Sequence, residues 1–95
     1  GWDLLLTALR LEEGSEVLMT AVTSPDMVRI TRRHGLTVVA VDVDPSSLSP
    51  CLEQVRRAIT PRTRVICLTH LYGSVTPVAP FAALAREAGV LLLED

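Results

Sequence analysis

The feature that most limits the possible folds is a regular alternation between short apolar segments and amphipathic segments of helical period. Strands are predicted in four segments: 17–23, 36–44, 64–73 and 90–95. Helices are predicted in four others: 2–11, 24–35, 45–60 and 79–89. Short connections make each strand–helix–strand unit a right-handed crossover, so the strands run parallel. The sequence therefore predicts an α/β fold with three layers, in which crossover helices cover a mainly parallel sheet.

Two of the predicted helices have recognisable start signals. In the segment 24–35, Ser24 can cap free amides, Pro25 suits the first helical position and Gly35 suits the end. In the segment 45–60, Ser49 before Pro50 suggests the same kind of start. Each of these helices is therefore expected to begin at a serine cap followed by proline.

Hydrophobic pattern also predicts which residues are buried. The segment 2–11 is apolar on several faces and is expected to form a buried helix. The segment 36–44 is nearly continuous Val and Ala, which is typical of a strand buried on both faces. The last helix is expected to face inward through four residues: Phe81, Leu84, Ala85 and Ala88. Gly89 should end that helix, and Cys67 should lie in the core.

Composition argues against several partners. A net charge of -2, from 9 basic and 11 acidic residues, provides no positive field for nucleic acid. Cys51 and Cys67 have neither CxxC nor metal-ligand spacing, so we expect no metal site and a reduced, cytoplasmic setting. The first apolar segment is too short to span a bilayer and lacks the pattern of a signal peptide, so no membrane association is expected.

Several nucleotide-binding and hydrolytic motifs are absent from the sequence. The apolar strand that ends in Glu94 and Asp95 could be a Walker B strand, but the P-loop that should accompany it is missing. The five glycines do not form a GxGxxG fingerprint, and there is no GxSxG turn. All nine basic residues are arginines, so an amine nucleophile must come from outside these residues.

A parallel sheet brings the polar ends of its strands to one edge, where helix N-termini favour anions. The residues expected there are Thr20 to Ser24, Asp42, Asp44, Thr69 to Ser74, Glu94 and Asp95. We therefore expect a small-molecule site at this edge. His70, which lies in this set, could contact the ligand or could bond to backbone, and both readings stay open.

The order of several short motifs resembles one family over essentially the whole chain. These motifs are EEGSEV, VDVDP, ITPRT, HLYG and LLLED, of which ITPRT followed by HLYG is the most specific pair. In this order they are similar to the DegT/DnrJ/EryC1/StrS family of sugar aminotransferases, which depend on pyridoxal 5'-phosphate and have fold type I. The resemblance implies that residues 1–95 are part of the cofactor-binding large domain, cut from a larger protein at both ends.

The resemblance assigns roles to individual residues. Asp95 matches the aspartate that pairs with the pyridine nitrogen of the cofactor and so tunes its chemistry. Gly1, Trp2 and Asp3 match the turn that holds the cofactor phosphate, although Trp2 stands where Thr or Ser is usual. Ser24 matches the aromatic residue that stacks on the ring, but a serine has no stacking face and is explained by helix capping.

The activity that the resemblance implies is transfer of an amino group, usually from glutamate, to a keto-sugar nucleotide. A homodimer is also implied, together with a lysine beyond residue 95 that carries the cofactor. The departures at Trp2 and Ser24 motivate one alternative, a family remnant or binding module without catalysis. Another is a different activity of fold type I, such as dehydration of a sugar, because these residues do not select the substrate.

Overall fold

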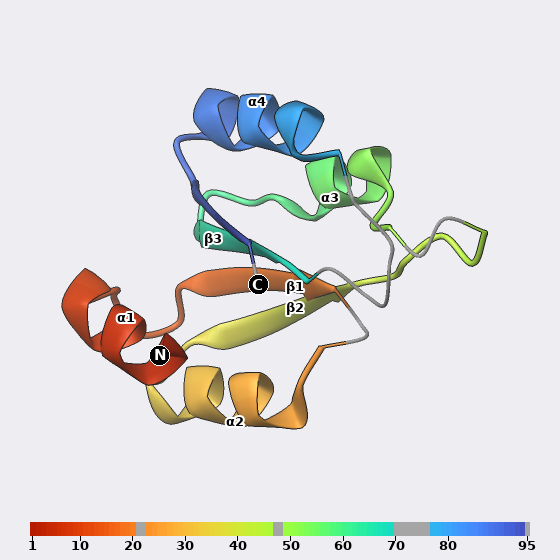
Figure 1. The fold of residues 1–95 in the computed structure, drawn as a ribbon. Coiled ribbons are helices and arrows are strands. Elements are labelled where there is room, and N and C mark those ends of the chain that lie inside the picture. Colours follow the sequence, from red (N-terminus) through yellow and green to blue (C-terminus); the bar gives the residue numbers. More distant parts are fainter. Residues whose placement is uncertain (21–22, 47–48, 70–76, 95) are drawn as a thin grey trace.

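The computed structural model describes residues 1–20, 23–46, 49–69 and 77–94, and within them helices and strands alternate as predicted. The elements are α1 (Trp2–Leu9), β1 (Glu16–Thr20), α2 (Pro25–Arg33), β2 (Thr37–Val41), α3 (Leu52–Ala58), β3 (Thr63–Leu68), α4 (Val78–Ala88) and β4 (Leu91–Glu94). The strands form one sheet in the order β2-β1-β3-β4, and every pair is parallel. In Figure 1, α1 and α2 cover one face of this sheet and α3 and α4 cover the other. The predicted three-layer α/β architecture is confirmed.

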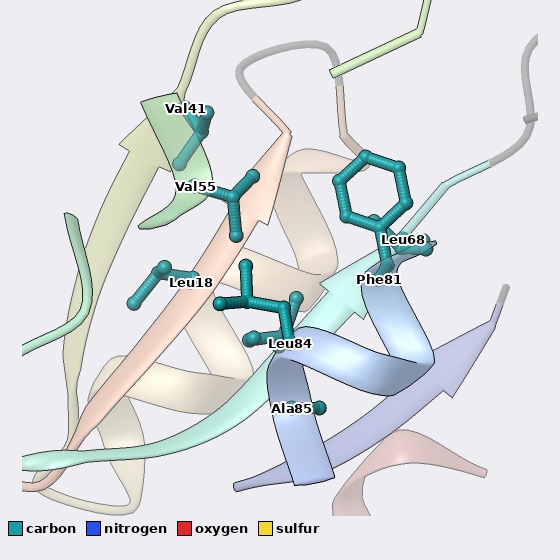
Figure 2. Packing of buried hydrophobic residues seen from close by; sticks show 8 residues of the cluster. Leu18, Val41, Val55, Leu68, Phe81, Leu84 and Ala85 are labelled. Atoms are coloured by element: carbon teal, nitrogen blue, oxygen red, sulfur yellow. The ribbon is translucent and has the colours of Figure 1, made fainter. Parts of the chain in front are cut away.

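Two hydrophobic cores lie on opposite faces of the sheet, because successive strand residues point to opposite sides. In β1, Leu18 joins the core under α3 and α4, whereas Val17 and Met19 join the core under α1 and α2. The first core consists of Leu18, Val41, Val55, Ile66, Leu68, Phe81, Leu84 and Ala85, all of which except Ile66 are labelled in Figure 2. The second consists of Leu6, Val17, Met19, Leu36, Val65 and Cys67.

The boundaries predicted for α2 are confirmed. The Ser24 hydroxyl accepts a hydrogen bond from the amide of Asp26 at 3.2 Å, and Pro25 is the first helical residue. At the other end Gly35 has a φ of +77°, a conformation that a residue with a Cβ rarely adopts. A start signal and a stop signal therefore fix this helix at the positions where the sequence places them.

Replacing Ser24 with Ala should remove this cap and lower the free energy of unfolding by about 1 kcal/mol. The Asp26 amide would lose its acceptor at an exposed helix end, so the effect should be local. Urea unfolding followed by circular dichroism measures the change. Ser24→Asp is the matched control, because its carboxylate can accept the same bond and should leave stability nearly unchanged. Equal losses in both variants would show that the cap is not the cause.

Two predictions of complete burial were wrong. The strand β2 lies at the edge of the described sheet, so Thr37 and Ala40 are exposed and only Val41 is buried. In α1, Leu6 is buried but Leu4 is 73% exposed, because the helix covers the sheet with one side only. Continuous hydrophobicity predicts an element correctly here without predicting its position in the layer.

Two local predictions also need correction. The helix α3 begins at Leu52 after Cys51, and Pro50 is held instead in an antiparallel bridge with Val43, so Ser49 does not cap the helix. In α4 the predicted inward residue Ala88 is exposed, since it lies in the last turn before Gly89. The predicted stop at Gly89 is confirmed by its φ of +70°. None of the helices in the described ranges is long and apolar enough to cross a bilayer.

Candidate functional site

A cleft of about 340 Å³ lies where the first turns of two helices meet the ends of two strands. Its described lining residues come from the start of α1 (Gly1, Trp2, Leu5), the start of α2 (Ser24, Met27), β3 (Cys67) and the end of β4 (Leu93, Glu94). Ligands of open parallel α/β sheets bind at this kind of edge, beyond the carboxyl ends of the strands. The cleft is therefore the candidate ligand site of this chain.

The N-terminal end of α1 presents free backbone donors at the cleft. Gly1 is the N-cap, no side chain of the described residues caps the helix, and the first helical bond runs from the Leu5 amide to the Gly1 carbonyl at 3.1 Å. The preceding amides have no acceptor within the helix, and together with the helix dipole they favour an anion.

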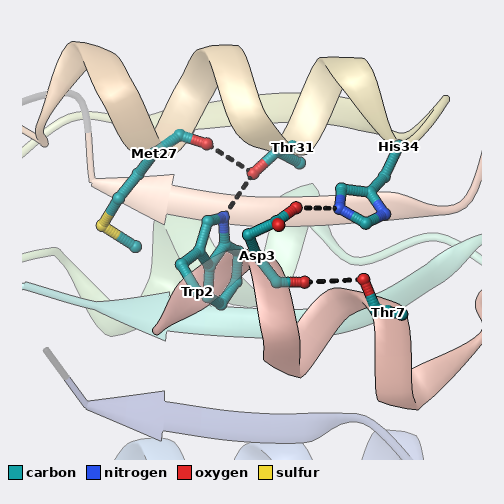
Figure 3. Close-up of polar contacts among 6 residues, drawn as sticks. All are labelled: Trp2, Asp3, Thr7, Met27, Thr31 and His34. Carbon is teal, nitrogen blue, oxygen red and sulfur yellow. Dashed lines mark hydrogen bonds and ion pairs between the residues drawn. The ribbon is translucent and has the colours of Figure 1, made fainter.

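Trp2 is the first residue of α1, and its indole is anchored to α2 (Figure 3). The indole Nε1 donates a hydrogen bond to the Thr31 hydroxyl at 2.8 Å, and that hydroxyl donates to the Met27 carbonyl at 2.6 Å. Thr31 is fully buried, whereas Trp2 is partly buried. Both Trp2 and Met27 also line the cleft, so this chain of bonds fixes part of the cleft wall.

Asp3 follows Trp2 in the sequence but does not line the cleft. Its carboxylate lies 2.7 Å from Nε2 of His34, at the C-terminal end of α2 (Figure 3). A carboxylate directed into the anion-favouring end of α1 would repel a phosphate, and the contact with His34 holds it elsewhere. Of the turn Gly1 to Asp3, the structure thus brings Gly1 and Trp2 to the cleft and leaves the Asp3 side chain outside it.

Ser24 lies in the cleft wall as well as at the start of α2. Its hydroxyl is already used in the cap of the helix, and its side chain is small. His70 and Asp95, the two other residues predicted for the site, lie outside the described residues. The last two described residues, Leu93 and Glu94, line the cleft directly before Asp95 in the sequence.

Four lining residues were not predicted as part of the site: Leu5, Met27, Cys67 and Leu93. Cys67 was assigned to the core, and it is indeed buried at 2% exposure while it also borders the cleft. The signal that could have found Met27 is its position one helical turn after Ser24, on the same side of α2. Among the described residues, no group of three or more His, Cys, Asp or Glu could hold a metal ion.

Fold and site together define a class of protein: a parallel α/β protein with a cleft at the ends of its strands, the edge at which ligands of such sheets bind. The sequence model of the DegT/DnrJ/EryC1/StrS aminotransferase family matches residues 1–95. The chain belongs to this family, and its architecture is that of part of a fold type I transferase.

Comparison with characterised proteins agrees with this assignment. The chain is 36% identical to a dTDP-4-dehydro-2,3,6-trideoxy-D-glucose 4-aminotransferase from Saccharopolyspora spinosa over 92 residues, which are 97% of this chain and 24% of that enzyme. The chain therefore spans about a quarter of the length of this relative.

Solved structures of the same fold show the same correspondence. The aminotransferase TlmJ from Streptoalloteichus hindustanus matches with a TM-score of 0.92 and 30% identity, over 100% of this chain and 26% of that chain. The E. coli GDP-4-keto-6-deoxy-D-mannose-3-dehydratase with bound hydrated PLP matches with a TM-score of 0.87 and 27% identity, over 99% of this chain and 26% of that chain. Both an aminotransferase and a dehydratase thus contain this arrangement of elements.

Proposed function

We propose that residues 1–95 form part of the cofactor-binding large domain of a pyridoxal-phosphate-dependent aminotransferase that acts on keto-sugar nucleotides. The observation that carries the proposal is the cleft, which combines the amide end of α1 with the end of β4 in a chain that matches an aminotransferase family throughout. The Saccharopolyspora relative, a sugar 4-aminotransferase, supports the substrate class.

The residues of the cleft fit the cofactor. The cleft lies within the range of roughly 300–1,000 Å³ that small-molecule pockets occupy. The free amides at the start of α1 would bind the phosphate. Apolar side chains, among them Leu5, Met27 and Leu93, would enclose the ring.

We further propose the role of Asp95 that the family resemblance implies. When bound, pyridoxal phosphate supplies a ring that accepts electrons from the substrate. The Asp95 carboxylate would hold a proton on the pyridine nitrogen, because an adjacent negative charge favours the protonated ring. The lysine that carries the cofactor would lie outside residues 1–95, which contain arginine as their only strongly basic residue. A homodimeric, cytoplasmic enzyme with glutamate as amino donor completes the proposal.

Binding of an aldehyde-free cofactor analogue tests the proposal, because this analogue cannot form a covalent bond to a lysine. Deoxypyridoxine phosphate carries the same ring and phosphate but cannot form a bond to an amine. We expect the protein that contains this chain to bind it at least about tenfold more tightly than deoxypyridoxine, because only the former places a phosphate on the α1 amides. Isothermal titration calorimetry measures both affinities. Absence of binding would favour the family remnant without catalysis and contradict the proposal.

A second candidate function is dehydration of a keto-sugar nucleotide. The structural match to the E. coli GDP-4-keto-6-deoxy-D-mannose-3-dehydratase favours it, because that enzyme contains the same arrangement of elements with PLP bound. The two activities are distinguished by their products when the protein is supplied with a keto-sugar nucleotide and glutamate. Transfer of nitrogen from ¹⁵N-glutamate into the sugar indicates the aminotransferase, whereas loss of a hydroxyl without nitrogen gain indicates the dehydratase.

A further inference from the structure

The two residues that depart from the family pattern lie in the walls of the same cleft. By the family resemblance, Trp2 stands where a small hydroxyl residue is expected, and Ser24 stands where an aromatic residue is expected. The two positions are 22 residues apart in sequence, yet both border the cleft of about 340 Å³. The cleft thus has a large aromatic side chain in one wall and a small polar side chain in another.

The indole of Trp2 is held in a way that leaves its faces free of polar contacts. Its hydrogen bond to Thr31 is made by Nε1, whose N–H lies in the plane of the ring. Such a bond restrains the orientation of the ring without covering either π face. In Figure 3 the Trp2–Thr31–Met27 series of bonds ties the indole to α2. Among the described lining residues Trp2 is the only aromatic one.

We propose that Trp2 provides the aromatic wall against which the pyridine ring of the cofactor packs, and that Thr31 positions the indole for this contact. The inference rests on the proposed cofactor-binding function. Offset stacking on an indole stabilises a bound flat heterocycle. A protonated pyridine is stabilised further, because among aromatic side chains Trp attracts a cation to its face most strongly. In this arrangement Ser24 only caps α2, and its small side chain leaves space in the cleft for the ring.

The alternative is that Trp2 merely fills space, since it also packs against the core under α1 and α2. Four variants separate the two readings. Trp2→Phe keeps an aromatic face, whereas Trp2→Leu keeps apolar volume without one. Thr31→Val removes the acceptor of the indole bond with little change of shape, whereas Thr31→Ser keeps the hydroxyl. If Trp2 only fills space, any loss of ligand affinity should match the loss of stability in the same variant. Trp2→Phe and Trp2→Leu should then bind the ligand equally well.

The experiment measures deoxypyridoxine phosphate binding by titration calorimetry on the protein that contains this chain. We expect the dissociation constant to rise about three- to tenfold in Trp2→Leu and by less than about twofold in Trp2→Phe, the size typical for one aromatic contact. Thr31→Val should weaken binding by about two- to threefold, which is less than the loss in Trp2→Leu. Thr31→Ser keeps the hydroxyl and should bind the analogue as tightly as the wild type does. Urea unfolding of each variant shows whether stability and affinity change separately.

A second readout is the ¹⁹F chemical shift of the Trp2 indole in the wild-type protein. The indole of Trp2, labelled as fluorotryptophan and assigned by its loss in Trp2→Phe, should change its ¹⁹F chemical shift when the analogue binds. Binding by the wild type with an unchanged Trp2 signal and equal affinities in Trp2→Leu and Trp2→Phe would overturn the inference but leave the proposed function intact. Failure of the wild type to bind the analogue would overturn both.

Discussion

Replacement of Asp95 with Asn is expected to slow amino transfer about 10²- to 10³-fold, the size typical for loss of one preorganised electrostatic contact. An amide carries no negative charge, so it would no longer favour protonation of the pyridine nitrogen in the proposed site. The rate is measured in the protein that contains this chain, from the change in cofactor absorbance after mixing with L-glutamate. Because a carboxylate and its amide have nearly the same shape, the fold should be unaffected.

The matched control for this variant is Asp42→Asn. Asp42 follows β2, is exposed and does not line the cleft, so the same chemical change at the end of another strand should leave the rate within about twofold. Equal rates for Asp95→Asn and the wild type, with the cofactor bound in both, would remove Asp95 from the proposed mechanism. Equal losses in the two variants would point to a general effect of charge rather than to a specific contact.

Replacement of Leu18 with Ala should cost about 2–5 kcal/mol of stability, because it removes buried methyl groups and leaves a cavity. Leu18 is 1% exposed and lies in β1, between two neighbouring strands and against the core under α3 and α4 (Figure 2). In residues 1–95 alone, β2 and β4 are the edges of the described sheet, so we expect marginal stability even before the mutation. The isolated variant should therefore be largely unfolded in buffer.

Urea unfolding of the protein that contains this chain measures the loss in Leu18→Ala, with Leu4→Ala as the matched control. Leu4 is 73% exposed on α1, so the same truncation there should change stability by less than about 0.5 kcal/mol. A steep two-state transition at high urea for the isolated wild-type chain would contradict the expected marginal stability. Similar losses in both variants would contradict the assignment of the core.

The fold could be predicted where local signals and hydrophobic pattern agree. Ser24, Pro25 and Gly35 marked α2 because capping, a fixed φ and a positive φ are properties of single residues. The burial of Cys67 followed from the apolar run of β3, which lies between β1 and β4 in the sheet. Such signals need no knowledge of the tertiary structure.

Positions within the layers could not be predicted, because they depend on contacts between distant segments. The strand β2 has the composition of a central strand but lies at the edge of the described sheet. Pro50 resembles a helix start but pairs with Val43, a contact that no local pattern indicates.

The candidate site was predictable in outline from the topology and the family resemblance. Parallel strands share one edge, and Gly1, Trp2 and Ser24 lie in the cleft there. The contact between Trp2 and Thr31 was not predictable, since it joins residues 29 positions apart through side chains alone. This contact holds the Trp2 indole in place as part of the cleft wall.

The central claim is that the cleft at the ends of the strands binds pyridoxal phosphate. A crystal structure of the protein that contains this chain, grown with the cofactor, tests it most directly. The account predicts the phosphate at the amides of the α1 first turn and the Asp95 carboxylate within about 3 Å of the pyridine nitrogen. A cofactor bound elsewhere, or an Asp95 carboxylate on the side of the sheet away from Gly1, would contradict it.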